Sequence, residues 1–301
     1  MGIADRDYVR NAPPPRSMGS AGIGQMSGWS VTTWLIALCV GVFVLDLLLL
    51  NTNLAYFRVE RLVPVSETEA VFVETYLPKQ QAIELDEAGQ LRGLVVQSNP
   101  VVRQAIPVGP IERWGFFSAD TAVFGGQVWR WVGFQFLHAG GWHLLGNMIG
   151  LYFFGSLIET YLGRRRYLAF YLLCGVAGPV IYCMFALAGI LQTTSATPLI
   201  GASAGVFGIL AAAAVIAPNA TVLVYGILPM QLRTMALLLL GFAAFMVFTN
   251  GNNAGGEAAH LGGAALGYLF IRHPEWLKWA ELGPKTRLPK PKSSGYMRYT
   301  G

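Results

Sequence analysis

The feature that most constrains this chain is a long interval without any charged side chain. Residues 167–232 contain no Asp, Glu, Lys or Arg, and residues 31–50 contain only Asp46. A helix crosses a hydrocarbon core ~30 Å thick with about 20 apolar residues. Across the chain 12% of residues are charged, against about 25% in a soluble domain. The sequence therefore predicts a helical bundle embedded in a membrane.

Hydropathy predicts six membrane-spanning helices. The fourth and sixth are short and rich in Gly and Ala, which predicts burial among other helices, where small residues permit close backbone approach. Pro218 ends the fourth stretch, because proline cannot continue a helical hydrogen-bond ladder. The six stretches are residues 31–50, 143–161, 167–191, 202–217, 233–249 and 258–272.

Positive charge predicts the orientation of the bundle. Basic residues gather in the N-terminal segment 1–30, at Arg164, Arg165 and Arg166, and in the tail 273–301. With six spans these segments lie on one side, which the positive-inside rule makes cytoplasmic. The net charge of +5 thus reflects membrane orientation, and no nucleic-acid partner is expected.

The N-terminal segment is polar and Pro-rich and does not resemble a cleaved signal peptide. Together with the chain length, this predicts a multi-pass protein of a bacterial inner membrane. Cys39, Cys174 and Cys183 all fall in apolar stretches, so we interpret them as packing residues and expect neither a disulfide nor a metal site. No cofactor is expected.

Residues 51–142 form the long outside segment between the first two spans. Alternation of apolar and polar residues at 70–76 and 91–96 predicts short strands, and thus a small β element within an insertion at 51–113. We interpret this insertion as a spacer. Residues 114–138 are rich in aromatic side chains, which predicts an interfacial loop in the outer headgroups.

Ser203 is a candidate nucleophile at the outside start of the fourth stretch. Its neighbours Gly201, Ala202, Ala204 and Gly205 are small, so a substrate backbone can approach the hydroxyl. A helix N-terminus also offers unpaired N–H groups and partial positive charge to a developing oxyanion. Alone the pattern is weak, because Gly and Ser in membrane helices usually serve packing.

His260 is the candidate base, at the outside start of the sixth stretch. Gly263 and Gly267 are four residues apart and share one helix face, the spacing that brings two helices close. His260, three residues before Gly263, is expected on roughly that face and at a depth similar to Ser203. A hydroxyl nucleophile needs a base within hydrogen-bond reach, and His260 is the residue placed to supply it.

A third polar group surrounds the start of the second stretch. His143 and Asn147 are spaced i and i+4 on one helix face, and His138 precedes them. The Asn147 amide and a ring N–H of His143 can both donate hydrogen bonds. The pair is interpreted either as part of an oxyanion pocket with the Ser203 amide or as a polar clamp between helices.

Taken together, these motifs occur in an order that resembles the rhomboid family of intramembrane serine proteases. The resemblance covers residues 114–273 and rests on Trp129-Arg130, His138, His143-x-x-x-Asn147, Gly201-x-Ser203 and His260-x-x-Gly263-x-x-x-Gly267. It implies an all-α bundle of six transmembrane helices with its core at 114–272. Two departures are Ala204, where Gly is frequent, and the longer insertion.

The resemblance also implies roles for single residues. Ser203 and His260 would form a catalytic dyad without a third, acidic member, and the Ser203 amide, His143 and Asn147 would form the oxyanion hole. The remaining matched residues would support this site or the fold: Phe207 against the catalytic histidine, Gly201, Gly263 and Gly267 in close packing, His138 and Trp129-Arg130 in the interfacial loop, and Glu159 as a structural carboxylate.

The expected function is cleavage of transmembrane segments of other proteins, with single-span membrane proteins as substrates and the lipid bilayer as surroundings. One alternative is a catalytically silent protein that binds membrane clients, which retention of both Ser203 and His260 disfavours. Another is a transporter using His260, Asn147 and His143 as a polar path, although the chain lacks an internal repeat. The oligomeric state is left open.

Overall fold

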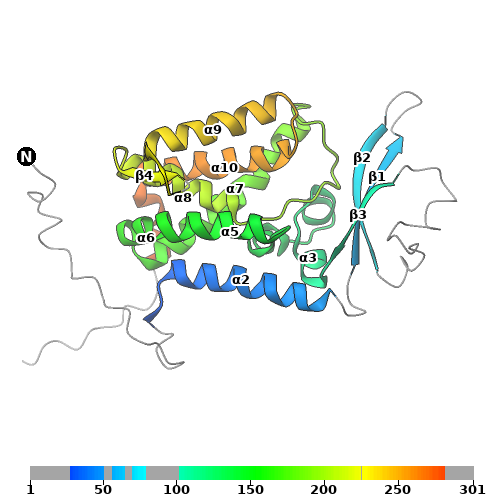
Figure 1. Ribbon diagram of the computed structural model, residues 1–301, viewed down its shortest axis with the longest axis horizontal. Helices are drawn as coiled ribbons and strands as arrows, with labels where there is room; N and C mark the ends of the chain where they lie inside the picture. Colours follow the sequence, from blue (N-terminus) through cyan, green and yellow to red (C-terminus); the bar gives the residue numbers. More distant parts are fainter. Residues whose placement is uncertain (1–27, 51–55, 65–69, 79–101, 225, 282–301) are drawn as a thin grey trace, which may run out of the picture.

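A computed structural model of the chain describes residues 28–50, 56–64, 70–78, 102–224 and 226–281. The described part is mostly helical. Its helices lie side by side in one bundle, with α2 (Val31–Leu49) along one edge and α9 (Leu232–Phe248) along the opposite edge. A small β sheet stands beyond one end of the bundle (Figure 1).

Helices occupy the six positions at which apolar stretches predict them. By length and composition, α2 and α7 are each able to cross a membrane, and α8 and α9 are shorter apolar helices. The second position holds α5 and α6, joined by the π-helical turn η6 (Leu151–Gly155). The remaining bounds are α5 (Gly141–Gly150), α6 (Ser156–Leu162), α7 (Arg164–Leu187), α8 (Ser203–Ile216) and α10 (Ala254–Arg272).

The outer helices present apolar side chains to their surroundings. Leu45 and Leu48 on α2 and Leu237 and Phe242 on α9 are all exposed. In contrast, most of α8 is buried, as its content of Gly and Ala predicts. Apolar side chains exposed over so much of a bundle indicate contact with lipid and not with water.

Glycine allows the backbones of α8 and α10 to touch. A Cβ added at Gly263 would collide with the carbonyl oxygen of Ala204, and one at Gly267 with the carbonyl oxygen of Gly208. Each contact advances by four residues on both helices, so the two helices run in the same direction. This confirms that Gly263 and Gly267 share a face at which two helices come close, and the helix that they contact is α8.

The link between the second and third helices is shorter than predicted. Arg164, Arg165 and Arg166, expected as a loop, form the first turn of α7 instead. The chain changes direction between α6 and α7 at Gly163 alone, whose φ is 79°. Such a left-handed backbone strongly favours glycine, and one residue therefore suffices to connect α6 and α7.

Two small β structures make the predicted all-α description too narrow. Strand β2 (Ala70–Pro78) confirms the strand predicted at 70–76; it pairs antiparallel with β1 (Tyr56–Pro64), which pairs in turn with β3 (Val102–Val108). A hairpin of β4 (Thr221–Val224) and β5 (Leu228–Gln231), which the sequence did not predict, joins α8 to α9. The strand predicted at 91–96, the first 27 residues and the tail beyond 281 lie outside the described residues.

The segment between the sheet and α5 is organised around a buried arginine. Arg130 donates hydrogen bonds to the carbonyl oxygens of Phe116 at 2.6 Å and Arg113 at 3.3 and 3.4 Å, and to the side chain of Gln127 at 2.6 Å. Trp129 Nε1 donates to the carbonyl of Trp114 at 3.1 Å. These bonds join α3 (Pro110–Gly115) to α4 (Arg130–Gly133), and the segment also contains the short helices η4 (Ala119–Phe124) and η5 (Phe134–Phe136).

The aromatic residues of this segment divide into two groups. Trp114, Phe124 and Trp129 are exposed, whereas Phe117 and Phe134 are almost fully buried. The prediction of an aromatic layer at the membrane surface thus applies at most to the first group. The second group forms part of the core.

Two carboxylates attach α2 to the rest of the bundle. Glu159 on α6 accepts hydrogen bonds from the backbone N–H groups of Val31 at 2.8 Å and Thr32 at 2.9 Å, at the start of α2. Near the other end, Asp46 accepts from the backbone N–H groups of Ile111 at 2.8 Å and Glu112 at 3.1 Å, at the start of α3. Helix N-termini favour such acceptors, and the expected structural carboxylate at Glu159 thereby has a defined contact.

His138 lies buried between η5 and α5. Burial, together with the neighbouring His143, lowers the pKa of His138 from 6.5 to about 4. The imidazole is therefore neutral in the folded protein near pH 7.

The first prediction concerns the contact between α8 and α10. Gly263→Val should lower the melting temperature, because the added side chain must push the two backbones apart, and overpacking of this kind costs about 1–3 kcal/mol or more. Gly241→Val is the matched control, since a Cβ at Gly241 on α9 meets open space. Equal melting temperatures of the two variants would contradict the contact.

The second prediction concerns acid stability. Between pH 6.5 and about 4 the unfolded chain binds a proton at His138 that the folded protein does not bind, so acidification through this window lowers the free energy of unfolding, by roughly 3 kcal/mol at its lower end. His138→Gln should remove that part of the pH dependence of melting. His273→Gln, which changes an exposed histidine, should leave it; an unchanged slope in His138→Gln would contradict the prediction.

Candidate active site

Ser203 is the first residue of α8, and the chain before it is held in place by backbone hydrogen bonds. Leu199 and Phe117 exchange two such bonds, at 3.0 and 2.7 Å, and the N–H of Gly201 donates to the carbonyl of Phe134 at 2.9 Å. Gly201 has a φ of 132°, which strongly favours glycine. The strand-like approach and this turn together fix where the serine hydroxyl lies.

The hydroxyl of Ser203 meets the ring of His260. Ser203 Oγ lies 2.8 Å from His260 Nε2, a hydrogen bond between residues that are far apart in the sequence. The register of α8 and α10 accounts for the contact, because His260 precedes Gly263 by one turn and Ser203 directly precedes Ala204. The sequence-predicted pair is thus brought together by the helix contact, with the hydrogen bond only partly buried.

The ring of His260 has a stacking partner and a second hydrogen-bond partner. Phe207 stacks on it with ring centroids 4.2 Å apart and an angle of 5° between the planes, at the position expected from the sequence. On the far side of the ring, Nδ1 lies 2.9 Å from Glu257 Oε2. Sequence reasoning expected no acidic neighbour and missed Glu257, although an acid three residues before a histidine on a helix is a recognisable signal.

His143 lies against the turn that precedes Ser203. A Cβ at Gly201 would come within 2.8 Å of His143 Nε2 and 3.5 Å of Ser203 Oγ, so the absent side chain leaves room for both groups. The backbone N–H of Ala139 donates to His143 Nδ1 at 3.4 Å. In the neutral ring the hydrogen is then on Nε2, which faces the serine side. His138 packs edge-on against His143, with ring centroids 5.1 Å apart.

Asn147 has a local partner in the structure. Its Nδ2 donates to the carbonyl oxygen of His143 at 2.9 Å, one turn earlier on α5. The observed bond lies within one helix and does not clamp two helices together. No hydrogen bond among the described residues joins Asn147 to Ser203, and the second amide hydrogen of Nδ2 remains for another acceptor.

The N-terminus of α8 adds donors next to the hydroxyl. The first backbone N–H groups of a helix have no partner inside the helix, and in α8 these belong to Ser203, Ala204 and Gly205. They lie on the same turn as Ser203 Oγ. The site therefore combines a hydroxyl, an imidazole and a set of N–H donors.

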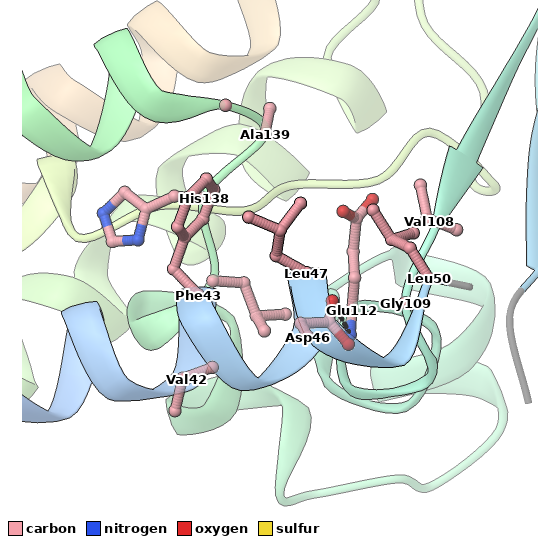
Figure 2. Close-up of a pocket in the computed structure, with 12 residues that line it drawn as sticks. Val42, Phe43, Asp46, Leu47, Leu50, Val108, Gly109, Glu112, His138 and Ala139 are labelled. Atoms are coloured by element: carbon pink, nitrogen blue, oxygen red, sulfur yellow. Dashed lines mark hydrogen bonds between the residues drawn. The ribbon is translucent and has the colours of Figure 1, made fainter. Parts of the chain in front are cut away.

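A separate cavity of about 190 Å³ lies outside this site. It is lined by residues at the end of α2, at the start of α3 and at 137–140, and Figure 2 shows Asp46, Glu112 and His138 around it. Ser203 and His260 do not line it. Among the described residues, no cluster of three or more His, Cys, Asp or Glu side chains could hold a metal ion.

Comparison with known proteins identifies the family. Residues 125–273 match the model of the Rhomboid domain. The chain is 30% identical to RHOMBOID-like protein 7 of Arabidopsis thaliana over 62% of its length and 55% of the relative's. It is 29% identical to mitochondrial Rhomboid protein 1 of Saccharomyces cerevisiae over 46% and 40%, and 32% identical to mitochondrial Presenilin-associated rhomboid-like protein A of Danio rerio over 50% and 38%.

The matched region contains every motif of the site, from Trp129 to Gly267. The chain spans about half the length of these relatives, or less. They are plant, yeast and fish proteins, and two are mitochondrial by name, so the expected bacterial inner membrane finds no support among them. The match and the motifs together show that this chain belongs to the rhomboid family of membrane-embedded proteins.

Proposed function

We propose that this chain is an intramembrane serine endopeptidase with Ser203 as nucleophile and His260 as general base. The observation that carries the proposal is the 2.8 Å hydrogen bond between Ser203 Oγ and His260 Nε2. A hydroxyl is a weak nucleophile until an adjacent base accepts its proton. The pair lies in a helical bundle with an apolar exterior, which supports a substrate that is itself in the membrane.

The chemistry follows from the positions of these groups. Ser203 Oγ attacks the carbonyl carbon of a peptide bond while its proton passes to His260 Nε2. The carbonyl oxygen becomes an oxyanion, which the Ser203 N–H, His143 Nε2–H and the second amide hydrogen of Asn147 are proposed to stabilise. The proton on Nε2 then passes to the leaving amine, and a water molecule repeats the two steps to release the acyl group.

The proposed substrates are single-span membrane proteins. A transmembrane helix hides its carbonyl groups in hydrogen bonds, because lipid offers no alternative partners. A peptide bond must therefore leave the helix before Ser203 can reach it. Segments that contain Gly, Pro or Ser near the membrane surface should unwind most readily and be cleaved in preference to uniformly apolar ones.

The proposed topology has six spans, formed by α2, α5 to α6, α7, α8, α9 and α10. Both termini then lie on the side of the basic residues Arg164, Arg165 and Arg166, in agreement with the positive-inside rule. Ser203 begins α8 and His260 lies in the second turn of α10, and both helices start on the opposite side, from which water would enter. In this proposal residues 51–113 are a spacer on that side and residues 114–272 form the proteolytic core.

A client-binding protein without catalysis is the competing function. It would bind the same membrane segments but would not form an acyl-enzyme. A reactive serine-directed probe separates the two, because covalent labelling at Ser203 requires an activated hydroxyl. Absence of labelling in folded wild-type protein would favour the silent alternative.

The third prediction concerns the nucleophile. Ser203→Ala should abolish cleavage of a panel of single-span substrates in liposomes, because the attacking oxygen is gone. The melting temperature should stay near that of the wild type, since one oxygen is removed from a partly buried position. Ser156→Ala on the exposed face of α6 is the matched control and should cleave normally. More than a trace of activity in Ser203→Ala would contradict the assignment.

The fourth prediction concerns Asn147. If its amide stabilises the oxyanion, Asn147→Ala should lower kcat far more than it raises KM, because the bond forms mainly in the transition state. With two other donors present, the expected fall is about tenfold to a few hundredfold. Labelling by a small reactive serine probe should survive.

The intrahelical bond to His143 predicts a different result for Asn147→Ala. Its loss alone would lower stability by about 1 kcal/mol and reduce activity only in proportion to unfolding. Turnover, KM and melting measured on one preparation decide between the two. Normal turnover by the folded fraction would remove Asn147 from the site.

A further inference from the structure

We infer that Glu257 is a positioning residue that completes a Ser203–His260–Glu257 triad. The inference deepens the proposed function and rests on it. Glu257 Oε2 lies 2.9 Å from His260 Nδ1, while Nε2 of the same ring lies 2.8 Å from Ser203 Oγ. The three side chains therefore form one continuous line of hydrogen bonds, with the imidazole in the middle.

The carboxylate defines which nitrogen of His260 carries the hydrogen. An ionised carboxylate only accepts hydrogen bonds, so the contact at 2.9 Å requires a hydrogen on Nδ1. In the neutral ring Nε2 is then bare and faces Ser203 Oγ as an acceptor. This is the tautomer that a general base needs, and the opposite tautomer would present an N–H to the hydroxyl and could not take its proton.

Glu257 also completes the orientation of the ring. Stacking on Phe207, with centroids 4.2 Å apart and planes at 5°, fixes the plane of the imidazole. It still permits the ring to rotate within that plane or to flip over. Hydrogen bonds at opposite ends of the ring remove this freedom. Phe207, Glu257 and Ser203 thus together determine one position of His260.

The charge of Glu257 matches the charge that the reaction creates. When Ser203 attacks, its proton moves to Nε2 and His260 becomes an imidazolium, while the Nδ1 hydrogen stays on Nδ1 and the carboxylate is not protonated. The side chains of Glu257 and His260 are each only 14% exposed, so water gives this cation little help. A neighbouring carboxylate compensates for that loss of solvation.

A simpler role for Glu257 is favourable placement of an acid in the first turn of a helix. Glu257 does lie in the first turn of α10, where a negative charge interacts well with the helix dipole. That role needs no contact with the ring. It predicts that removal of the charge lowers the melting temperature and leaves the turnover of the folded protein unchanged.

The test compares Glu257→Gln with the wild type in the full-length protein. Gln keeps the shape but can donate its amide hydrogen to Nδ1, which stabilises the wrong tautomer. We expect kcat to fall at least about tenfold, and at most by the ~10⁴-fold loss known for the equivalent change in a soluble serine protease, with KM changed little. A smaller fall in kcat overturns the inference.

Glu275→Gln is the matched control, because Glu275 also contacts a histidine, with Oε1 3.2 Å from His273 Nδ1, but that pair is exposed at the end of the bundle. It should turn over substrate like the wild type. A loss in this variant equal to that in Glu257→Gln would overturn the inference, since the effect would then come from charge alone.

A spectroscopic measurement makes the inference independent of cleavage. In protein labelled with ¹⁵N-histidine, the ring of His260 should show a hydrogen on Nδ1 near neutral pH in the wild type and in Ser203→Ala, and this signal should be lost or shifted in Glu257→Gln. A bare Nδ1 in the wild type overturns the inference. If the wild type cleaves no substrate and reacts with no serine probe, the proposed function fails. The tautomer of His260 still shows in that case whether Glu257 positions the ring.

Discussion

The bundle depends on the approach of two helices to backbone contact. Gly263 and Gly267 leave no side chain between α10 and the carbonyl oxygens of α8. In lipid there is little hydrophobic force to press helices together, so association relies on close packing of this kind. The contact also sets the register of the two helices, and with it the 2.8 Å distance between Ser203 and His260. A single packing constraint therefore supports both the fold and the candidate site.

Local contacts place the remaining groups of the site around the contact between α8 and α10. The turn at Gly201 admits His143 beside Ser203, and Phe207 covers one face of His260. The side chains of Ser203, His260, His143 and Asn147 each take part in a hydrogen bond. Such an arrangement suits the proposed proteolytic site, in which charge would develop briefly inside an apolar bundle.

Much of this arrangement could be predicted from the sequence because membrane helices have a strong periodic signal. The positions of the helices and the facing of Gly263 and Gly267 follow from hydropathy and spacing. The hairpin of β4 and β5 could not be recognised, since each strand has four residues and its alternation is masked by apolar neighbours. The sequence predicts a loop at residues 164–166, because charged residues usually flank membrane helices, whereas in the structure Gly163 alone makes the turn. The contact of Glu257 with His260 is not expected from the sequence, because the family resemblance implies a dyad without an acidic member.

The two carboxylates that attach α2 have a consequence for how the protein sits in a bilayer. Only 17% of the apolar window of α2 is buried, so lipid surrounds most of this helix. Fluid acyl chains form no specific contacts with an apolar helix, so they offer little resistance when the helix slides along its own axis. Two sets of hydrogen bonds prevent such sliding: Glu159 of α6 binds the start of α2, and Asp46 near the end of α2 binds the start of α3. The position of α2 along its axis is thereby fixed relative to the bundle. A membrane of different thickness must therefore thicken or thin around the protein.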